Sequence, residues 1–271
     1  RGTVSRTHAP GPHRTRPPLV VAIPAALAVL LLTLPLVAVL QRLPWGDAWE
    51  ILRSERTTDA LRVTLTVVPI TTLVAVVLGV PLGWVLARAP IRGRTLLRAI
   101  VLLPMVLPPV VGGTALLFAL GRRGLVGQWL DEWFGITLPF TTAGAVVATT
   151  FVALPFVVIT IEGGLRAVDP RTEEMAATLG ASPATTLRTV TLPAISGSLR
   201  AAVALAAARA LGEFGATIAF AGNRPGTTRT LPLEVFRALE EDPATALVIS
   251  VLLIAVSLLV LVALRGRWWP Q

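Results

Sequence analysis

Long apolar stretches separated by short polar segments dominate the pattern of this chain. A helix needs about 20 apolar residues to cross roughly 30 Å of hydrocarbon. The stretches that reach this length are 19–40, 60–87, 99–120, 140–161, 196–220 and 243–264. The first is too long for the apolar core of a signal peptide, and no small-residue cleavage site follows it. The pattern predicts an all-α integral membrane protein with six transmembrane helices in one domain, 19–264, between tails 1–18 and 265–271.

Arginine is distributed unevenly among the loops that these spans define. Cytoplasmic loops carry an excess of basic residues, and six spans place both termini on the same side. Arginines gather in both tails, in the 88–98 loop and around the 163–195 loop, whereas acidic residues offset the arginines of the remaining loops. We therefore expect both termini and 163–195 in the cytoplasm and 223–242 outside. Tryptophans near span ends suit anchoring at the lipid interface: Trp45, Trp129, Trp133, Trp268 and Trp269.

Composition narrows the classes of function. The chain is 54% hydrophobic with a mean hydropathy of +0.75, which is typical of a membrane protein. It has no cysteine, and both histidines, His8 and His13, lie in the N-terminal tail, so we expect neither a metal site nor a catalytic residue. It also lacks lysine, which excludes a P-loop in this chain because that motif needs a lysine at the phosphates. The net charge of +9 follows the loop topology, so we expect no nucleic-acid partner.

The third span contains prolines and glycines that are unfavourable in a continuous helix. A kinked or broken membrane helix is tolerated where protein or a cavity lies beside it. A helix lining the transport pathway and an ordinary proline kink in packed protein both fit this pattern. The residues concerned are Pro104, Pro108, Pro109, Gly112 and Gly113.

The fifth span is rich in alanine and glycine, which lets helices approach closely and suggests a central position. It also carries Arg209 and Glu213, four residues apart and hence on one face of a helix. Charged residues at this depth are costly and seldom face lipid. Arg209 could offer charge to an anion in the pathway. Alternatively the two residues form a mutually neutralising pair that fixes helix packing, and the spacing favours this. Glu162, at the end of the fourth span, is expected to be interfacial.

The polar stretch 169–193 predicts two short helices with a glycine turn between them. Asp169 and Ser182 suit N-caps, each is followed by a proline, and Gly180 suits a helix stop. Met175, Ala176 and Leu179 fall on one face of the first helix, with Glu173 and Glu174 beside them. An apolar patch with an acidic rim suits docking into a groove on another protein. Packing on the chain's own bundle is an equally open alternative.

This segment resembles the EAA loop of ABC importer permeases. That pattern reads Glu-Ala-Ala, three residues, Gly, nine residues, Ile, one residue, Leu-Pro. Met175 replaces an alanine and Val190 the isoleucine, and both keep an apolar group. The resemblance implies a coupling helix that inserts into a cleft on a cytoplasmic ATPase. The residues assigned to coupling are Glu173, Glu174, Met175, Ala176, Leu179, Gly180, Val190, Leu192 and Pro193.

The stretch 208–236 is similar to the molybdate branch of these permeases, in which an RALGEFGAT helix leads into an AGN-PG-T-TLPL loop. The 102–117 run resembles the same branch. Taken alone, 223–233 would be a surface loop, and 125–136 a short interfacial helix. The external-loop residues singled out by the resemblance are Asn223, Pro225, Gly226, Thr228 and Thr230.

Together these resemblances identify the chain as an ABC importer permease of the type I fold, in a bacterial cell membrane. They imply a homodimer, an extracytoplasmic oxyanion-binding protein and separate ABC ATPase subunits that use ATP and Mg²⁺, with no cofactor bound by this chain. The chain itself would not be an enzyme. Molybdate is the expected substrate, and tungstate or sulfate is the alternative. A proton- or sodium-coupled secondary transporter is the alternative of another class, but only Arg209 and Glu213 could serve its coupling ion.

Overall fold

The computed structural model describes residues 18–263, so the tails, including His8, His13, Trp268 and Trp269, lie outside the described residues. The chain divides into two units, 1–43 and 44–271. The described part of the first unit consists mainly of one helix, α1 (Leu19–Gln41), which contains Pro24 and Pro35. Apolar residues cover its whole circumference, which suits a lipid environment.

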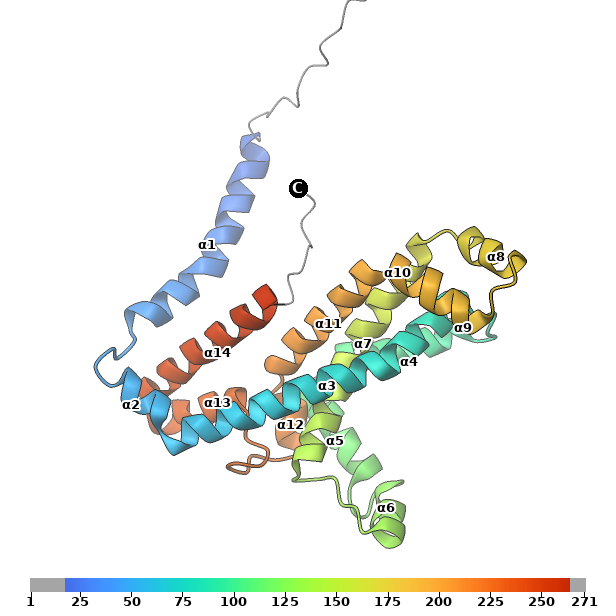
Figure 1. Ribbon diagram of the computed structural model, residues 1–271. Coiled ribbons are helices and arrows are strands. Elements are labelled where there is room, and N and C mark those ends of the chain that lie inside the picture. The colour runs from blue at the N-terminus through green and yellow to red at the C-terminus, as the bar shows by residue number, and fades with distance from the viewer. Residues whose placement is uncertain (1–17, 264–271) are drawn as a thin grey trace, which may run out of the picture. The chain divides into compact units, whose positions relative to one another are not determined.

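The second unit is built from helices, and the described residues contain no strand. Figure 1 shows the long helix α3 with α13 near its N-terminal end and α8 and α9 near its C-terminal end. The elements are α2 (Ala48–Arg53), α3 (Glu55–Arg88), α4 (Arg94–Val106), α5 (Pro109–Leu120), α6 (Gly127–Phe134), α7 (Thr142–Ala167), α8 (Arg171–Thr178), α9 (Pro183–Thr186), the π-helix η1 (Leu187–Thr191), α10 (Leu192–Ala194), α11 (Ser196–Leu211), α12 (Gly215–Phe220), α13 (Leu231–Glu241) and α14 (Pro243–Ala263).

Four helices are long and apolar enough to cross a membrane singly: α1, α3, α7 and α14. Two bent pairs raise the number of candidate spans within 18–263 to six, by length and composition. The first pair is α4 and α5, between which the chain bends by 116°. The second is Pro183–Ala194 and α11, with a bend of 73°. The chain is therefore a multi-pass membrane protein, but not a set of six straight helices.

Two of the predicted spans are not continuous helices. The prolines and glycines of 99–120 indicated its break, whereas the break in 196–220 was not expected. In 99–120 the helix breaks at Leu107 and Pro108, whose backbones are extended. Proline disfavours the helical conformation of the residue before it and cannot donate a backbone hydrogen bond, so two consecutive prolines end α4. In 196–220 the helix ends at Leu211, and α12 starts only at Gly215.

The core of the second unit is the contact between α3 and α7. A Cβ added at Gly79 would lie 2.7 Å from Val157 Cγ1, and one at Gly83 would lie 3.0 Å from the carbonyl oxygen of Val158. The glycines therefore allow the two helices to approach more closely than any side chain would. Small residues of α11, including Ala202 and Ala206, complete this core. Interfaces of small residues are typical of helix packing in membranes, where van der Waals contact supplies much of the association energy.

Of the two non-spanning segments 125–136 and 223–233, the second differs from the sequence expectation. Residues 125–136 contain the expected short helix, α6, and its Trp129 and Trp133 are exposed. The segment 223–233, expected to be a surface loop, instead folds inward: Thr228 and Thr230 are buried and α13 begins at Leu231. The cause is side-chain hydrogen bonding, since Thr228 Oγ1 accepts from the Arg224 N–H at 2.9 Å and Thr64 Oγ1 accepts from the Leu231 N–H at 2.8 Å.

Candidate functional site

The segment that follows α7 forms two short helices joined by a left-handed turn. Asp169 Oδ1 accepts the Arg171 N–H at 3.0 Å at the start of α8. Gly180 has φ +86°, a conformation that glycine adopts without strain. Ser182 Oγ then accepts the Thr185 N–H at 3.2 Å and caps α9. The caps and stop therefore lie where the sequence pattern predicts them.

The face of α8 that points away from the other helices is apolar and exposed. Met175 is 64% exposed and Leu179, directly after the helix, is 87% exposed, while no residue of α8 is buried. Glu174 is exposed on this helix and Ala176 is half-buried. Exposed apolar side chains on a short helix are the feature expected of a surface that docks into another protein.

Glu173 and Glu174 were both expected in an exposed acidic rim beside the apolar patch. This is wrong for Glu173, which is half-buried. Its carboxylate points into the bundle, where Oε2 lies 3.4 Å from Arg88 Nε and Oε1 accepts the Thr191 hydroxyl at 2.9 Å. The helical period explains the difference, because residues next to each other in sequence lie about 100° apart around a helix.

The remaining coupling candidates lie beyond Gly180, on the segment that leads into α11. Leu192 packs against the core between α3, α7 and α11, and Val190 is half-buried. Pro193 is exposed in the short helix α10. Of the nine candidates, Met175 and Leu179 form the exposed apolar face of α8 and the turn after it. Glu174 and Gly180 are also exposed on this segment.

The glycines of the third span are contact positions rather than part of an open surface. Gly112 and Gly113 are both buried. A Cβ at Gly112 would lie 3.1 Å from the Phe151 ring, and one at Gly113 would lie 2.6 Å from the Ala216 carbonyl oxygen. They therefore bring α5 against α7 and α12, whereas Pro108 and Pro109 at the break are exposed. This geometry favours packing over pathway lining for the two glycines.

Arg209 and Glu213 form an ion pair across the break between α11 and α12. Arg209 Nη2 lies 2.7 Å from Glu213 Oε2, in an orientation that falls outside hydrogen-bond geometry. The Glu213 side chain is 1% exposed and that of Arg209 is 25% exposed. Glu213 Oε1 also accepts the Ala216 N–H at 2.8 Å. Glu213 therefore satisfies a backbone donor at the start of α12 while Arg209 neutralises it.

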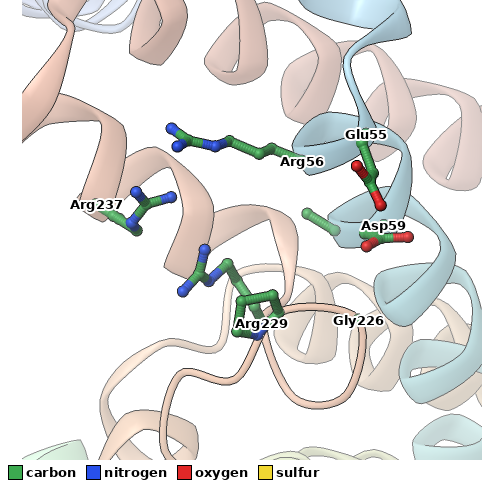
Figure 2. A pocket seen from close by; sticks show the side chains of 8 residues that line it. Glu55, Arg56, Asp59, Gly226, Arg229 and Arg237 are labelled. Atoms are coloured by element: carbon green, nitrogen blue, oxygen red, sulfur yellow. The ribbon is translucent and has the colours of Figure 1, made fainter.

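A pocket of about 370 Å³ lies at the N-terminal end of α3, and two of the five external-loop candidates line it. Figure 2 shows Glu55 and Asp59 on α3, and the guanidinium groups of Arg56, Arg229 and Arg237 on the opposite side of the opening. Pro225 and Gly226 border this pocket.

Inside the pocket wall, the arginines are already paired with acidic residues. Arg229 Nη1 donates to Glu234 Oε2 at 3.1 Å and Arg229 Nε to Asn223 Oδ1 at 2.7 Å. Arg237 pairs with Glu241, and also lies 3.5 Å from the buried Glu234. Asn223, Thr228 and Thr230 do not line the pocket. Thr228 and Thr230 are buried and Asn223 accepts from Arg229, so among the five candidates only Pro225 and Gly226 are exposed.

Two buried clusters were missed from the sequence. Glu162, expected to be interfacial, has a side chain that is 8% exposed and pairs with both Arg98 of α4 and Arg166 of α7. The spacing of Glu162 and Arg166, four residues apart, could have indicated that pair. The other cluster is Arg88, Glu173 and Thr191; its members are far apart in sequence, so no local signal marks it. No metal-ligand cluster occurs among residues 18–263.

The comparisons with known proteins decide the family. Residues 79–268 match the model of the binding-protein-dependent transport system inner membrane component. The chain belongs to this family. The matched region covers the second unit from the last third of α3 onward and includes the coupling-loop candidates, the broken spans and the external-loop candidates.

Relatives of the family that are similar over most of their length include three transport permeases. The chain is 45% identical to the molybdenum transport system permease protein ModB of Mycobacterium tuberculosis, over 91% of this chain and 93% of that protein. It is 40% identical to ModB of Escherichia coli K12, over 74% and 90%. It is 38% identical to the sulfate transport system permease protein CysT of Salmonella typhimurium, over 87% and 86%.

Solved structures share the fold at low sequence identity. A bacterial ABC transporter that imports alginate superposes with a TM-score of 0.74 at 18% identity, covering 91% of this chain and 92% of that one. The MetNI methionine transporter gives a TM-score of 0.60 at 19% identity, covering 76% and 91%. The chain therefore has the type I ABC importer permease fold, as the sequence predicts.

The Arg209–Glu213 pair can be tested by charge removal. Arg209→Ala should leave Glu213 buried and uncompensated, which costs about 3–5 kcal/mol for a buried pair, and should lower the yield and melting temperature of the purified protein. Arg209→Gln with Glu213→Gln should recover most of the loss, because an amide oxygen can still accept the Ala216 N–H. A double variant that is stable but does not transport would instead place the pair in the pathway.

Proposed function

We propose that this chain is the permease subunit of an ATP-driven importer of molybdate. The observation that carries the proposal is the 45% identity, over nine-tenths of both chains, to a permease named for molybdenum transport. The similarity to a sulfate permease, 38% over 87% of the chain, makes sulfate the second candidate. Tungstate has the same tetrahedral dianionic form as molybdate and is an expected co-substrate.

The chain contributes a pathway and a mechanical connection rather than bond chemistry. It has no lysine and hence no P-loop, so ATP and Mg²⁺ are used by separate ABC ATPase subunits in this proposal, and this chain binds no cofactor. A second copy of the chain supplies the other half of the pathway. An extracytoplasmic oxyanion-binding protein delivers the ion; one structural neighbour was solved with an alginate-bound periplasmic protein, which supports such a partner in general.

Selectivity between oxyanions is assigned to the binding protein. Molybdate, tungstate and sulfate share charge and shape and differ mainly in size and protonation. A binding protein can enclose the ion with directed donors, whereas a pathway that holds it weakly has little leverage over these differences. The ion pairs of the described arginines around the outer pocket agree with this assignment, because their charge is already compensated.

The orientation of the chain in the bacterial cell membrane follows from the arginine distribution. Both termini and the 163–195 loop are cytoplasmic in this proposal, and Asn223 to Asp242 face outward. Because the chain lacks cysteine, a single cysteine can be labelled without background. Thr227→Cys should react with a membrane-impermeant maleimide in intact spheroplasts and Thr189→Cys only after permeabilisation. The reverse pattern would invert the topology.

The α8 face is proposed to dock into the ATPase. Leu179→Asp places a charge on an exposed apolar anchor without touching the core. Losing a central interface anchor costs about 2 kcal/mol or more, roughly a thirtyfold weaker association. Glu174→Arg should also weaken the complex, because it reverses the charge of the one exposed acidic residue among the coupling candidates. Copurification with the ATPase measures both, and Leu239→Asp, an exposed leucine on α13, is the matched control. Full recovery of both variants would remove the docking assignment.

Transport by the reconstituted complex tests the substrate. Proteoliposomes with the cognate ATPase and binding protein should take up labelled molybdate, and uptake should fall to background without ATP. An excess of unlabelled sulfate should compete weakly and tungstate strongly. Strong competition by sulfate would move the assignment to a sulfate permease. ATP-independent uptake that a proton or sodium ionophore abolishes would instead indicate a secondary transporter.

A further inference from the structure

The coupling helix α8 is held to the bundle by polar contacts rather than by packing. None of its residues is buried, and Met175 and Leu179 point their apolar surface outward. On its inner side lies a cavity of about 710 Å³. The cavity is lined by apolar residues of α3, α7 and the segment after Gly180, including Val80, Trp84, Ile161, Leu165, Ala184 and Leu187. Displacement of α8 therefore meets little resistance from interlocked side chains.

One guanidinium group bridges the elements that meet at this point. Arg88 is the last residue of α3, and its Nη2 donates to the Val168 carbonyl oxygen at the end of α7 at 3.1 Å. Its Nε lies 3.4 Å from Glu173 Oε2 on α8. The other oxygen of Glu173 accepts the hydroxyl of Thr191, the last residue of η1, at 2.9 Å.

The burial of this cluster makes it stronger than a surface ion pair. The Arg88 and Glu173 side chains are 14% and 19% exposed, and Thr191 is buried. Reduced contact with water and salt weakens screening, so the charge contact counts for more than a fully exposed pair would. The Nε contact lies outside hydrogen-bond geometry, so attraction between the charges, rather than an aligned hydrogen bond, holds it.

We propose that the cluster of Arg88, Glu173 and Thr191 is the link through which displacement of α8 reaches the membrane helices. Through Arg88 it acts on α3 and the end of α7, and through Thr191 on the segment that enters α11. These are positioning residues: they touch neither substrate nor nucleotide. The inference rests on the proposed function, because it assigns the transmission step to a part of the coupling loop that faces away from the ATPase.

The competing route is the backbone itself, since α8 continues covalently through Gly180 to α9 and η1. This route passes through the glycine turn, and few side chains of α8 pack against the bundle. We therefore expect it to transmit the displacement of α8 poorly. The two routes differ in their response to side-chain changes. If the cluster transmits the motion, its loss uncouples hydrolysis from transport. If the backbone transmits it, the ratio of molybdate transported to ATP hydrolysed is unchanged.

The decisive measurement is this ratio in proteoliposomes that contain the full complex and its binding protein. Glu173→Gln removes the charge but keeps an acceptor for Thr191, and Thr191→Val keeps the charge pair but removes the hydroxyl link. Both should retain the ATPase subunits and hydrolysis while the ratio falls roughly tenfold, within the range typical of coupling between sites. Thr191→Ser, which restores the hydroxyl, should behave as the unmodified protein.

Glu162→Gln is the matched control. Glu162 is also a buried carboxylate paired with arginines of two helices, but no described contact joins it to α8. Its loss should lower stability and leave the ratio unchanged. An unchanged ratio in both Glu173→Gln and Thr191→Val, or an equal fall in Glu162→Gln, would overturn the proposal. If Glu173→Gln fails to assemble, Thr191→Val decides, because it retains the ion pair.

Failure of the proposed function would look different. The unmodified complex would then show no ATP-dependent molybdate uptake, or Leu179→Asp would copurify normally with the ATPase. Loss of complex recovery in Glu173→Gln and Thr191→Val, with wild-type recovery in Thr191→Ser and Glu162→Gln, would assign the cluster to docking and also overturn transmission.

Discussion

The close contact between α3 and α7 determines where the rest of the second unit can lie. Gly79 faces Val157 and Gly83 faces Ile161, so the contacts advance in the same direction along both helices and the helices run parallel. In a membrane, such contacts are stabilised by dispersion and close backbone approach, because lipid is as apolar as the side chains. The register of this contact carries Arg88 to the end of α7 and hence to the segment 169–193.

Polar side chains replace missing backbone partners at several helix starts, including the break between α11 and α12. Leaving a backbone N–H without a hydrogen-bond partner in hydrocarbon costs roughly several kcal/mol of free energy. Glu213 accepts the Ala216 N–H where α12 starts, and Ser182 caps α9. At the start of α14, Asp242 accepts the Ala244 N–H and the Thr245 hydroxyl. Hydrogen bonding, foremost from Thr245, holds the pKa of this carboxyl below its usual range.

The polar clusters of the described residues lie at the two ends of the helix bundle and at the break between α11 and α12. The cluster of Arg229, Glu234 and Arg237 secures the loop before α13, and two clusters around Glu162 and Glu173 secure the opposite end, where α7 leads into α8. Each joins residues from different helices or turns, so each fixes how elements sit relative to one another. The α8 face differs, because Met175 and Leu179 expose apolar side chains there.

The sequence by itself determined the class of fold, the positions of the short helices in 169–193 and the family resemblance. These follow from local signals: apolar length, N-cap and proline chemistry, and a glycine with positive φ. It did not determine that 196–220 breaks, that Thr228 turns inward or that Glu173 faces Arg88 while Glu174 faces outward. These features depend on contacts between residues far apart in sequence, such as Arg88 with Glu173 and Thr64 with Leu231. The packing of α3 against α7 and against α13 brings such groups within reach, because direction and distance between helices are set by tertiary contact rather than by period.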